Sequence, residues 1–254
     1  MDIRFDNQVV VVTGASTGIG AAAARAFGAC GAQVVVHYNR SAEAARAVAD
    51  AVTAAGGGAT LVQADVTRPE DVQRLVAAVM EAHGRIDVLI NNAGGLVERN
   101  PLEATPDEVY DAIMNLNVRS LFQLCKLVIP IMKRQGHGNI INVTSVAART
   151  GGGGGSSVYA AAKGAVVSLT RGLAKELAAH HIRVNALSPG LILTPFHDRW
   201  TPPAMMENLI KSVPMGRAGS ADECAGALLF LASDALSSYV TGQVIEVNGG
   251  MLLR

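Results

Sequence analysis

The chain has 254 residues, of which half are apolar but only 4% aromatic, and its 21 basic and 21 acidic residues leave a formal net charge of zero. A neutral chain has no general attraction for nucleic acid or anionic lipid, so neither is expected as a partner. The first residues lack the basic and apolar segments of a secretory signal, and no uninterrupted apolar run approaches the roughly 18 residues of a membrane span. We therefore expect a cytoplasmic protein.

Valine-rich segments alternate with longer segments of helical periodicity. The predicted strands are Val9–Thr13, Gln33–Tyr38, Thr60–Ala64, Val88–Asn91, Ile140–Thr144, Arg183–Leu187 and Gln243–Val247. The predicted helices lie near Gly18–Gly28, Ala42–Ala55, Pro69–His83, Pro106–Arg134, Ser157–Ala179 and Ala221–Ala232. The early strands are nearly continuous apolar runs, which is typical of parallel strands covered by helices on both faces. This order predicts an α/β fold: one Rossmann-type, doubly wound parallel sheet of about seven strands, in a single domain over residues 1–254.

Two segments do not fit the simple alternation. Five consecutive glycines, Gly151–Gly155, resemble a flexible linker but lie between a strand and a helix of the same sheet, so we expect a loop near the ligand cleft. The segment near 191–214 fits no long β–α unit, and we expect a short-helix insertion that covers the cleft. Its candidate pocket residues, which could equally pack against a second subunit, are Phe196, His197, Trp200, Met205 and Met206.

A glycine-rich turn joins the first strand to the first helix. It reads Thr13-Gly14-Ala15-Ser16-Thr17-Gly18-Ile19-Gly20. Glycine lets the backbone turn sharply and approach a pyrophosphate, whose charge suits a helix N-terminus. The spacing is not G-x-G-x-x-G, and no Gly-Lys-Ser/Thr follows, which excludes a P-loop. Taken alone, the turn could be purely structural.

The turn matches T-G-x-x-x-G-x-G, and further motifs follow it in order. These are Asp65-Val66 after the third strand, N-N-A-G at Asn91–Gly94, Asn117-Val118-Arg119-Ser120, Ser145, Y-x-x-x-K at Tyr159–Lys163, Ser188-Pro189-Gly190 with Thr194 beyond, and Asn248-Gly249-Gly250 in place of D-G-G. Together they resemble the short-chain dehydrogenase/reductase family over essentially the whole chain. The resemblance extends to its 3-oxoacyl-ACP reductase-like and sugar dehydrogenase members.

The resemblance implies an NAD(P)-dependent enzyme that interconverts a carbonyl and a secondary alcohol by hydride transfer. The leading interpretation is an NADP-linked reductase of a ketone or 3-oxoacyl group acting on a small molecule. A sugar or polyol dehydrogenase would use the same residues. An alternative of another class is a non-catalytic dinucleotide-binding or scaffold protein, although such a protein has no need of a tyrosine hydroxyl.

The expected catalytic residues are Asn117, Ser145, Tyr159 and Lys163. Tyr159 and Lys163 are four residues apart, so a helix places them on one face. A free tyrosine has a pKa of about 10, and a nearby ammonium is expected to lower it so that Tyr159 can act as general acid and base. Ser145 can donate a hydrogen bond to the substrate oxygen. By resemblance, the backbone carbonyl of Asn117 holds a water that links Lys163 to solvent.

The second strand ends without an acidic residue that would bind both ribose hydroxyls of NAD. Arg40 and Ser41 can bind a 2′-phosphate instead, so NADP is favoured and NAD remains possible; Arg40 as a solvated loop charge is the alternative. The cofactor-binding residues that the resemblance implies are Gly14, Ser16, Thr17, Gly18, Ile19, Gly20, Tyr38, Asn39, Arg40, Ser41, Asp65, Val66, Asn92, Ala93, Gly94, Tyr159, Lys163, Pro189, Gly190, Ile192 and Thr194.

The three cysteines and six histidines show no metal-ligand spacing, so no metal is expected. Members of the family commonly assemble through the two long helices after the fourth and fifth strands and through the C-terminal strand. The resemblance therefore implies a homotetramer, or a homodimer.

Overall fold

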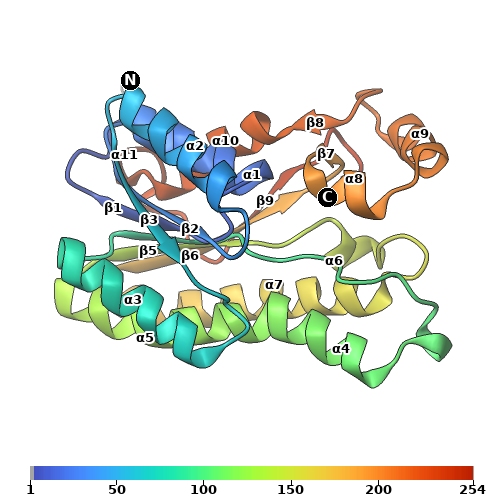
Figure 1. Ribbon diagram of the computed structural model, residues 1–254, viewed down its shortest axis with the longest axis horizontal. Helices are drawn as coiled ribbons and strands as arrows, with labels where there is room; N and C mark the ends of the chain where they lie inside the picture. Colours follow the sequence, from blue (N-terminus) through green and yellow to red (C-terminus); the bar gives the residue numbers. More distant parts are fainter. Residues whose placement is uncertain (1–2, 254) are drawn as a thin grey trace.

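The computed structural model describes residues 3–253, apart from the side chain of Arg199 (Figure 1). Seven parallel strands form the main sheet in the order β3-β2-β1-β4-β5-β6-β9. Their bounds are β1 Val9–Val12, β2 Gln33–Tyr38, β3 Gly58–Gln63, β4 Val88–Asn91, β5 Gly138–Val143, β6 Ile182–Pro189 and β9 Val244–Val247. The predicted doubly wound Rossmann-type sheet is confirmed.

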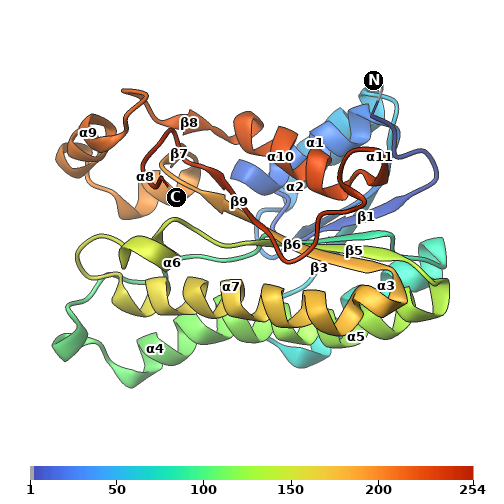
Figure 2. The same ribbon diagram turned by 180° about the vertical axis from the view of Figure 1, so that it is seen from behind.

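Helices cover both faces of the sheet, as Figures 1 and 2 show. One face carries α1 (Gly18–Ala29), α2 (Ala42–Ala54), α10 (Ala221–Ala232) and the short α11 (Asp234–Ser237). The other carries α3 (Pro69–His83), α4 (Asp107–Met114), α5 (Ser120–Gln135) and α7 (Ser157–Leu177). The four valines of β1 show why the sheet is apolar throughout: Val10 and Val12 pack into the core on one side, and Val9 and Val11 into the core on the other.

The strand order reverses beside β1, because β2 lies on one side of it and β4 on the other. In open α/β sheets this point leaves a crevice at the carboxyl ends of the strands, where ligands bind. The glycine turn follows β1 directly, and the N-N-A-G motif ends β4. The fold therefore brings both motifs to the same crevice.

The helix predicted near Pro106–Arg134 is confirmed in extent, but its interior contains a π-helical turn that the sequence did not predict. The helical path begins at Asp107 and ends at Gln135, but a π-helical turn (η2, Asn115–Arg119) separates α4 from α5. The turn surrounds the buried Asn117, and π-turns inside helices often occur at functional sites. A 3₁₀ turn (η1, Leu102–Ala104) precedes α4.

Five of the seven predicted strands have different bounds. Three differ by one or two residues at an end, because β1 ends at Val12, β5 spans Gly138–Val143 and β9 begins at Val244. The third strand of the chain begins at Gly58 and ends at Gln63, in full register with β2, instead of running over Thr60–Ala64. The sixth extends over Ile182–Pro189 because it pairs with β5 on one side and β9 on the other.

Several short elements were not predicted. The helix α6 (Ala147–Thr150) lies between β5 and the glycine loop, and η3 (Ala178–His180) follows α7. A two-stranded sheet pairs β7 (Ile192–Leu193) with β8 (Gly219–Ser220). Between these strands, in the segment where the sequence predicts short helices, the chain forms α8 (Pro195–Trp200) and α9 (Pro203–Ser212), which lie beyond the end of the main sheet that also carries α6 (Figure 1).

By length and composition alone, the helical stretch Asp107–Gln135 could cross a membrane, with a mean hydropathy of 1.2. The search for uninterrupted apolar runs missed it. In the structure, however, Leu121, Leu124, Val128 and Met132 of α5 pack into the core beneath the sheet. One buried stripe of this kind is typical of an amphipathic helix in a folded domain.

Candidate active site

The glycine turn is shaped for a close backbone approach. Gly14 and Gly18 have φ of 64° and 55°, values that favour glycine. The helix α1 starts at Gly18, its first turn has no acidic residue, and no described side chain caps its N-terminal N–H groups. Unpaired N–H groups at a helix start attract an anion such as a pyrophosphate. The turn therefore fits the phosphates of a dinucleotide.

The N-N-A-G motif braces this turn from the neighbouring strand. The hydroxyl of Thr13 accepts hydrogen bonds from the backbone N–H groups of Asn92 and Ala93, both at 3.0 Å. The side-chain amide of Asn92 donates to the carbonyls of Thr13 at 2.8 Å and of Gly14 at 3.1 Å. The predicted cofactor residues of β1 and β4 thus form one hydrogen-bonded unit.

His37 is a second support of the turn that the sequence analysis missed. It is 2% exposed near the end of β2. Its Nδ1 accepts the backbone N–H of Gly14 at 3.0 Å, and its Nε2 lies 3.0 Å from the carbonyl of Ala64. Because an N–H can only donate and a carbonyl can only accept, these partners require the neutral tautomer protonated at Nε2. Burial lowers the pKa of His37, which keeps the ring in that form.

The end of β2 is open to solvent beyond His37. Tyr38 is half-buried, whereas Asn39, Arg40 and Ser41 are exposed, and no ion pair to Arg40 occurs among residues 3–253. In the loop after β3, Asp65 accepts hydrogen bonds from the N–H and hydroxyl of Thr67, at 2.9 and 2.7 Å. Val66 is buried beside it.

The predicted catalytic side chains of β5 and α7 meet at the carboxyl end of the sheet. Lys163 is 4% exposed; its Nζ lies 5.7 Å from the centroid of the Tyr159 ring and donates to the carbonyl of Val143 at 3.0 Å. The hydroxyl of Ser145 hydrogen-bonds to the Tyr159 phenol. Thr144 points away and donates to the backbone carbonyl of Lys163 at 2.8 Å, so only Ser145 faces the tyrosine.

The expected lowering of the tyrosine pKa by its lysine is wrong for this structure. Burial raises the pKa of Tyr159 to about 12, and the hydrogen bond from Ser145 opposes that shift only in part. Burial also lowers the pKa of Lys163 to about 8, so its ammonium is itself costly in this environment. Residue spacing alone could not reveal that burial decides the direction of both pKa shifts. Around pH 7 the phenol is protonated.

Asn117 joins the same cluster through its side chain. Its amide donates to the carbonyls of Gly95 at 2.8 Å and Ile113 at 2.9 Å, and its Oδ1 accepts the N–H of Gly95 at 3.1 Å. A Cβ on Gly94 would lie 2.8 Å from Asn117 Oδ1 and 3.0 Å from Lys163 Nζ, so a larger residue would not fit there. The side chain of Asn117 therefore fixes the chain after β4 against the lysine.

The segment after β6 closes the crevice from the other side. The carbonyl of Pro189 accepts the N–H of Val146 at 3.0 Å, which holds the two strand ends together. Beyond Gly190, the chain turns back so that a Cβ on Gly18 would lie 3.2 Å from Thr194 Cγ2. Ile192, one of the expected cofactor residues, is buried in the small sheet. The structure thus brings Thr194 over the glycine turn.

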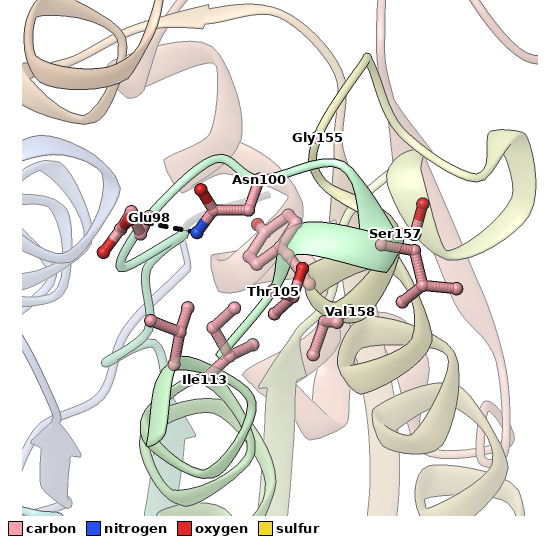
Figure 3. Close-up of a pocket in the computed structure, with 10 residues that line it drawn as sticks. Glu98, Asn100, Thr105, Ile113, Gly155, Ser157 and Val158 are labelled. Atoms are coloured by element: carbon pink, nitrogen blue, oxygen red, sulfur yellow. Dashed lines mark hydrogen bonds between the residues drawn. The ribbon is translucent and has the colours of Figure 1, made fainter. Parts of the chain in front are cut away.

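A pocket opens beside Tyr159 (Figure 3). Gly155, Ser157 and Val158 line one part of it, and Glu98, Asn100, Thr105 and Ile113, from the chain after β4 and from α4, line another. Leu102 and Val109 complete the lining. The glycine loop is not a free linker: Gly155 accepts the N–H of Asn100 at 3.1 Å. Among residues 3–253, no group of three or more His, Cys, Asp or Glu side chains could hold a metal ion.

Comparison with known proteins identifies the family. Residues 14–252 match the family described as Enoyl-(Acyl carrier protein) reductase. The chain is 41% identical over 246 residues to a 3-oxoacyl-[acyl-carrier-protein] reductase of Synechocystis sp., covering 97% of both proteins.

Two solved structures are also similar. One is 7α-hydroxysteroid dehydrogenase complexed with NADH and 7-oxo glycochenodeoxycholic acid, with a TM-score of 0.92, 35% identity and coverage of 98% of this chain and 96% of that one. The other is gluconate 5-dehydrogenase from Burkholderia cenocepacia with NADP and tartrate, with a TM-score of 0.90, 35% identity and coverage of 98% and 97%. The chain belongs to the short-chain dehydrogenase/reductase family of NAD(P)-dependent oxidoreductases, which interconvert carbonyls and alcohols.

Proposed function

We propose that this protein is an NADP-linked reductase of a ketone or 3-oxoacyl group in which Tyr159 donates the proton. The observation that carries this proposal is the meeting of Tyr159, Ser145 and Lys163 at the end of the sheet that also holds the glycine turn. A nucleotide-binding scaffold would need the turn but not this arrangement of hydroxyl groups.

The protonation state of the site favours reduction. A phenol with a pKa of about 12 carries its proton near neutrality and can give it to the alkoxide that develops when a carbonyl is reduced. Ser145 can donate a second hydrogen bond to the same oxygen and stabilise its charge. Alcohol oxidation would first require Tyr159 to lose its proton, which burial opposes. Lys163 and Asn117 position these groups.

The crevice suits a nicotinamide dinucleotide, which when bound supplies or accepts the hydride. The glycine turn would hold its pyrophosphate, and Arg40 and Ser41, exposed at the end of β2, would bind a 2′-phosphate. With no acidic side chain from Tyr38 to Ser41, nothing in this stretch repels that phosphate. We therefore expect NADP to be preferred, with NAD also used.

A sugar or polyol dehydrogenase is the second candidate, supported by the likeness to gluconate 5-dehydrogenase. We further propose that the protein is a cytoplasmic homotetramer. Tyr110 on α4 and Phe122 on α5 are 48% and 50% exposed on the outer face of the helical layer, where burial against a second copy would stabilise an assembly.

The proposal is tested by following the oxidation of NADPH and NADH with a panel of ketones, oxoacyl thioesters and keto sugars. We expect turnover of ketones or oxoacyl thioesters, with a lower KM for NADPH. Replacing Arg40 by Ala should raise the KM for NADPH about tenfold, the effect of one charge-assisted hydrogen bond, and leave that for NADH nearly unchanged. Turnover of sugars alone would favour the second candidate, and no turnover of any substrate would contradict the proposal.

A further inference from the structure

Arg99 connects two segments that border the crevice. It lies in the chain after β4, and its Nε donates to the carbonyl of Trp200, at the end of α8, at 2.9 Å. Its Nη1 donates to the carbonyl of Gly154, in the glycine loop, at 3.0 Å. The guanidinium is therefore held in a defined place between the loop and the helix. Its Nη2 has no hydrogen-bond acceptor among the described residues.

The charge of Arg99 is not balanced by a carboxylate. Within residues 3–253 it forms no ion pair, because no carboxylate oxygen, including that of the adjacent Glu98, lies within 4 Å of its guanidinium nitrogens. Burial lowers the pKa of Arg99, and no neighbouring acid opposes that effect. The partly buried Arg183, by contrast, pairs with Asp234 at 2.9 Å. A partly buried cation without a partner carries a desolvation cost that an anion would offset.

A row of side chains leads from Arg99 to Tyr159. Arg99 is close enough to His197 for its charge to lower the pKa of that ring, although burial is the larger cause. The His197 ring lies 5.1 Å from the ring of Phe196, which lies 6.0 Å from the ring of Tyr159. Phe196 and His197 thus connect the proton donor at one end of this row with the unpaired guanidinium at the other.

We propose that Arg99 binds a carboxylate of the substrate, so that the protein reduces an oxo acid whose ketone reaches Tyr159. This rests on the function proposed above and narrows its substrate class. With Nε and one Nη1 hydrogen used by the two carbonyls, the second Nη1 hydrogen and one Nη2 hydrogen remain to form the fork that receives a carboxylate in bidentate fashion. The apolar Phe196 between the two ends suits the carbon chain that separates ketone from carboxylate.

The test uses straight-chain oxo acids whose ketone lies progressively further from the carboxylate, each paired with its methyl ester. The ester keeps the ketone and removes the charge. For at least one chain length, we expect the native enzyme to have a higher kcat/KM for the acid than for the ester. In Arg99→Gln this acid-to-ester ratio should fall about 10- to 100-fold, since a charge-assisted hydrogen bond contributes on the order of 1.5–3 kcal/mol. Arg99→Lys, which keeps the charge but not the fork, should fall between the two.

Arg134→Gln is the matched control, because Arg134 is exposed near the end of α5 and has no role in the crevice; its ratio should equal that of the native enzyme. An acid-to-ester ratio unchanged in Arg99→Gln, with both substrates affected alike, would mean that Arg99 only holds the loop to the helix and would overturn the proposal. An ester preference in the native enzyme at every chain length would do the same.

Calorimetric binding to the NADPH complex separates this proposal from the proposed function. Hexanoate and methyl hexanoate contain no ketone, so their binding needs no turnover. Tighter binding of hexanoate than of its ester, lost in Arg99→Gln, would support the carboxylate site even if no ketone were reduced. Equal binding of both would refute the site even in an active enzyme. Displacement of hexanoate by inorganic phosphate at similar concentration would also count against it, because a carboxylate-selective fork should discriminate.

Discussion

Removing the nitrogen atoms of His37 should loosen the glycine turn and weaken cofactor binding. His37→Phe keeps a ring of similar shape but leaves the N–H of Gly14 and the carbonyl of Ala64 without the partners that they have at 3.0 Å. His37→Asn is the matched variant, because its side-chain oxygen can still accept the Gly14 N–H and does not titrate.

The cost follows from the burial of these groups. An unsatisfied buried polar group costs about 1–3 kcal/mol, which applies in full to the Ala64 carbonyl and less to Gly14, since Gly14 lies nearer the surface. We therefore expect His37→Phe to lower the free energy of unfolding by about 2–4 kcal/mol. Because a misplaced turn no longer fits a pyrophosphate, the Kd for the cofactor should rise about tenfold or more, equivalent to about 1.4 kcal/mol.

The same contact predicts a pH dependence. The pKa of His37 is lowered in the folded protein, so below the unfolded value of about 6.5 the unfolded chain binds a proton that the folded chain does not. The stability that His37 contributes is therefore complete above that pH and is lost as the pH falls below it, by at most about 1.4 kcal/mol per pH unit. Protonation of Nδ1 would also break the bond to Gly14.

Urea unfolding and NADH fluorescence titrations at about pH 7.5 and 5.5 measure both effects. NADH is used because the 2′-phosphate of NADPH itself titrates near pH 6. The native protein should lose stability and affinity at the lower pH by more than His37→Asn does. Identical pH profiles in the two proteins, or native-like cofactor binding by His37→Phe, would refute the role assigned to this histidine.

Two further predictions concern the packing of the crevice. Gly20→Ala should abolish cofactor binding and destabilise the fold, because the added Cβ would collide with the Gly14 carbonyl. Gly226→Ala is the control: its Cβ would enter open space, so the free energy of unfolding should rise by up to about 1 kcal/mol. Thermal melts and NADPH titration measure both effects, and normal NADPH binding by Gly20→Ala would contradict the prediction. Asn117→Ala loses three hydrogen bonds, two of them to Gly95, and should reduce kcat by more than it changes the KM for NADPH; an unchanged kcat would exclude a positioning role.

Regular patterns made much of the fold predictable from the sequence. The helix Ala221–Ala232 has the predicted bounds because Ser220 and Glu223 form a capping box that defines where the helix begins. The strands β2 and β4 also have the predicted bounds, since continuous apolar runs bordered by turns leave little choice. Local sequence was sufficient to predict the bounds of a helix or strand wherever a cap or a continuous apolar run defined both.

Tertiary contacts decided what the sequence analysis missed. The π-turn around Asn117 depends on hydrogen bonds to Gly95, a residue 22 positions away, so no helical periodicity could predict it. The sequence did contain a signal for His37, because a histidine that continues a run of buried valines in a strand needs polar partners. In the structure these partners are backbone groups of two loops, the N–H of Gly14 and the carbonyl of Ala64. The pKa of Tyr159 was misjudged because burial, which decides it, is a property of the fold.

The account depends most directly on Tyr159 as the proton donor. Steady-state reduction of the best ketone substrate by Tyr159→Phe, with NADPH binding measured by fluorescence in the same preparation, tests that role. We expect kcat to fall by at least about 100-fold, the contribution of a general acid, while the Kd for NADPH rises no more than about tenfold, the loss of one hydrogen bond. A variant that reduces the ketone at the native rate would contradict the account.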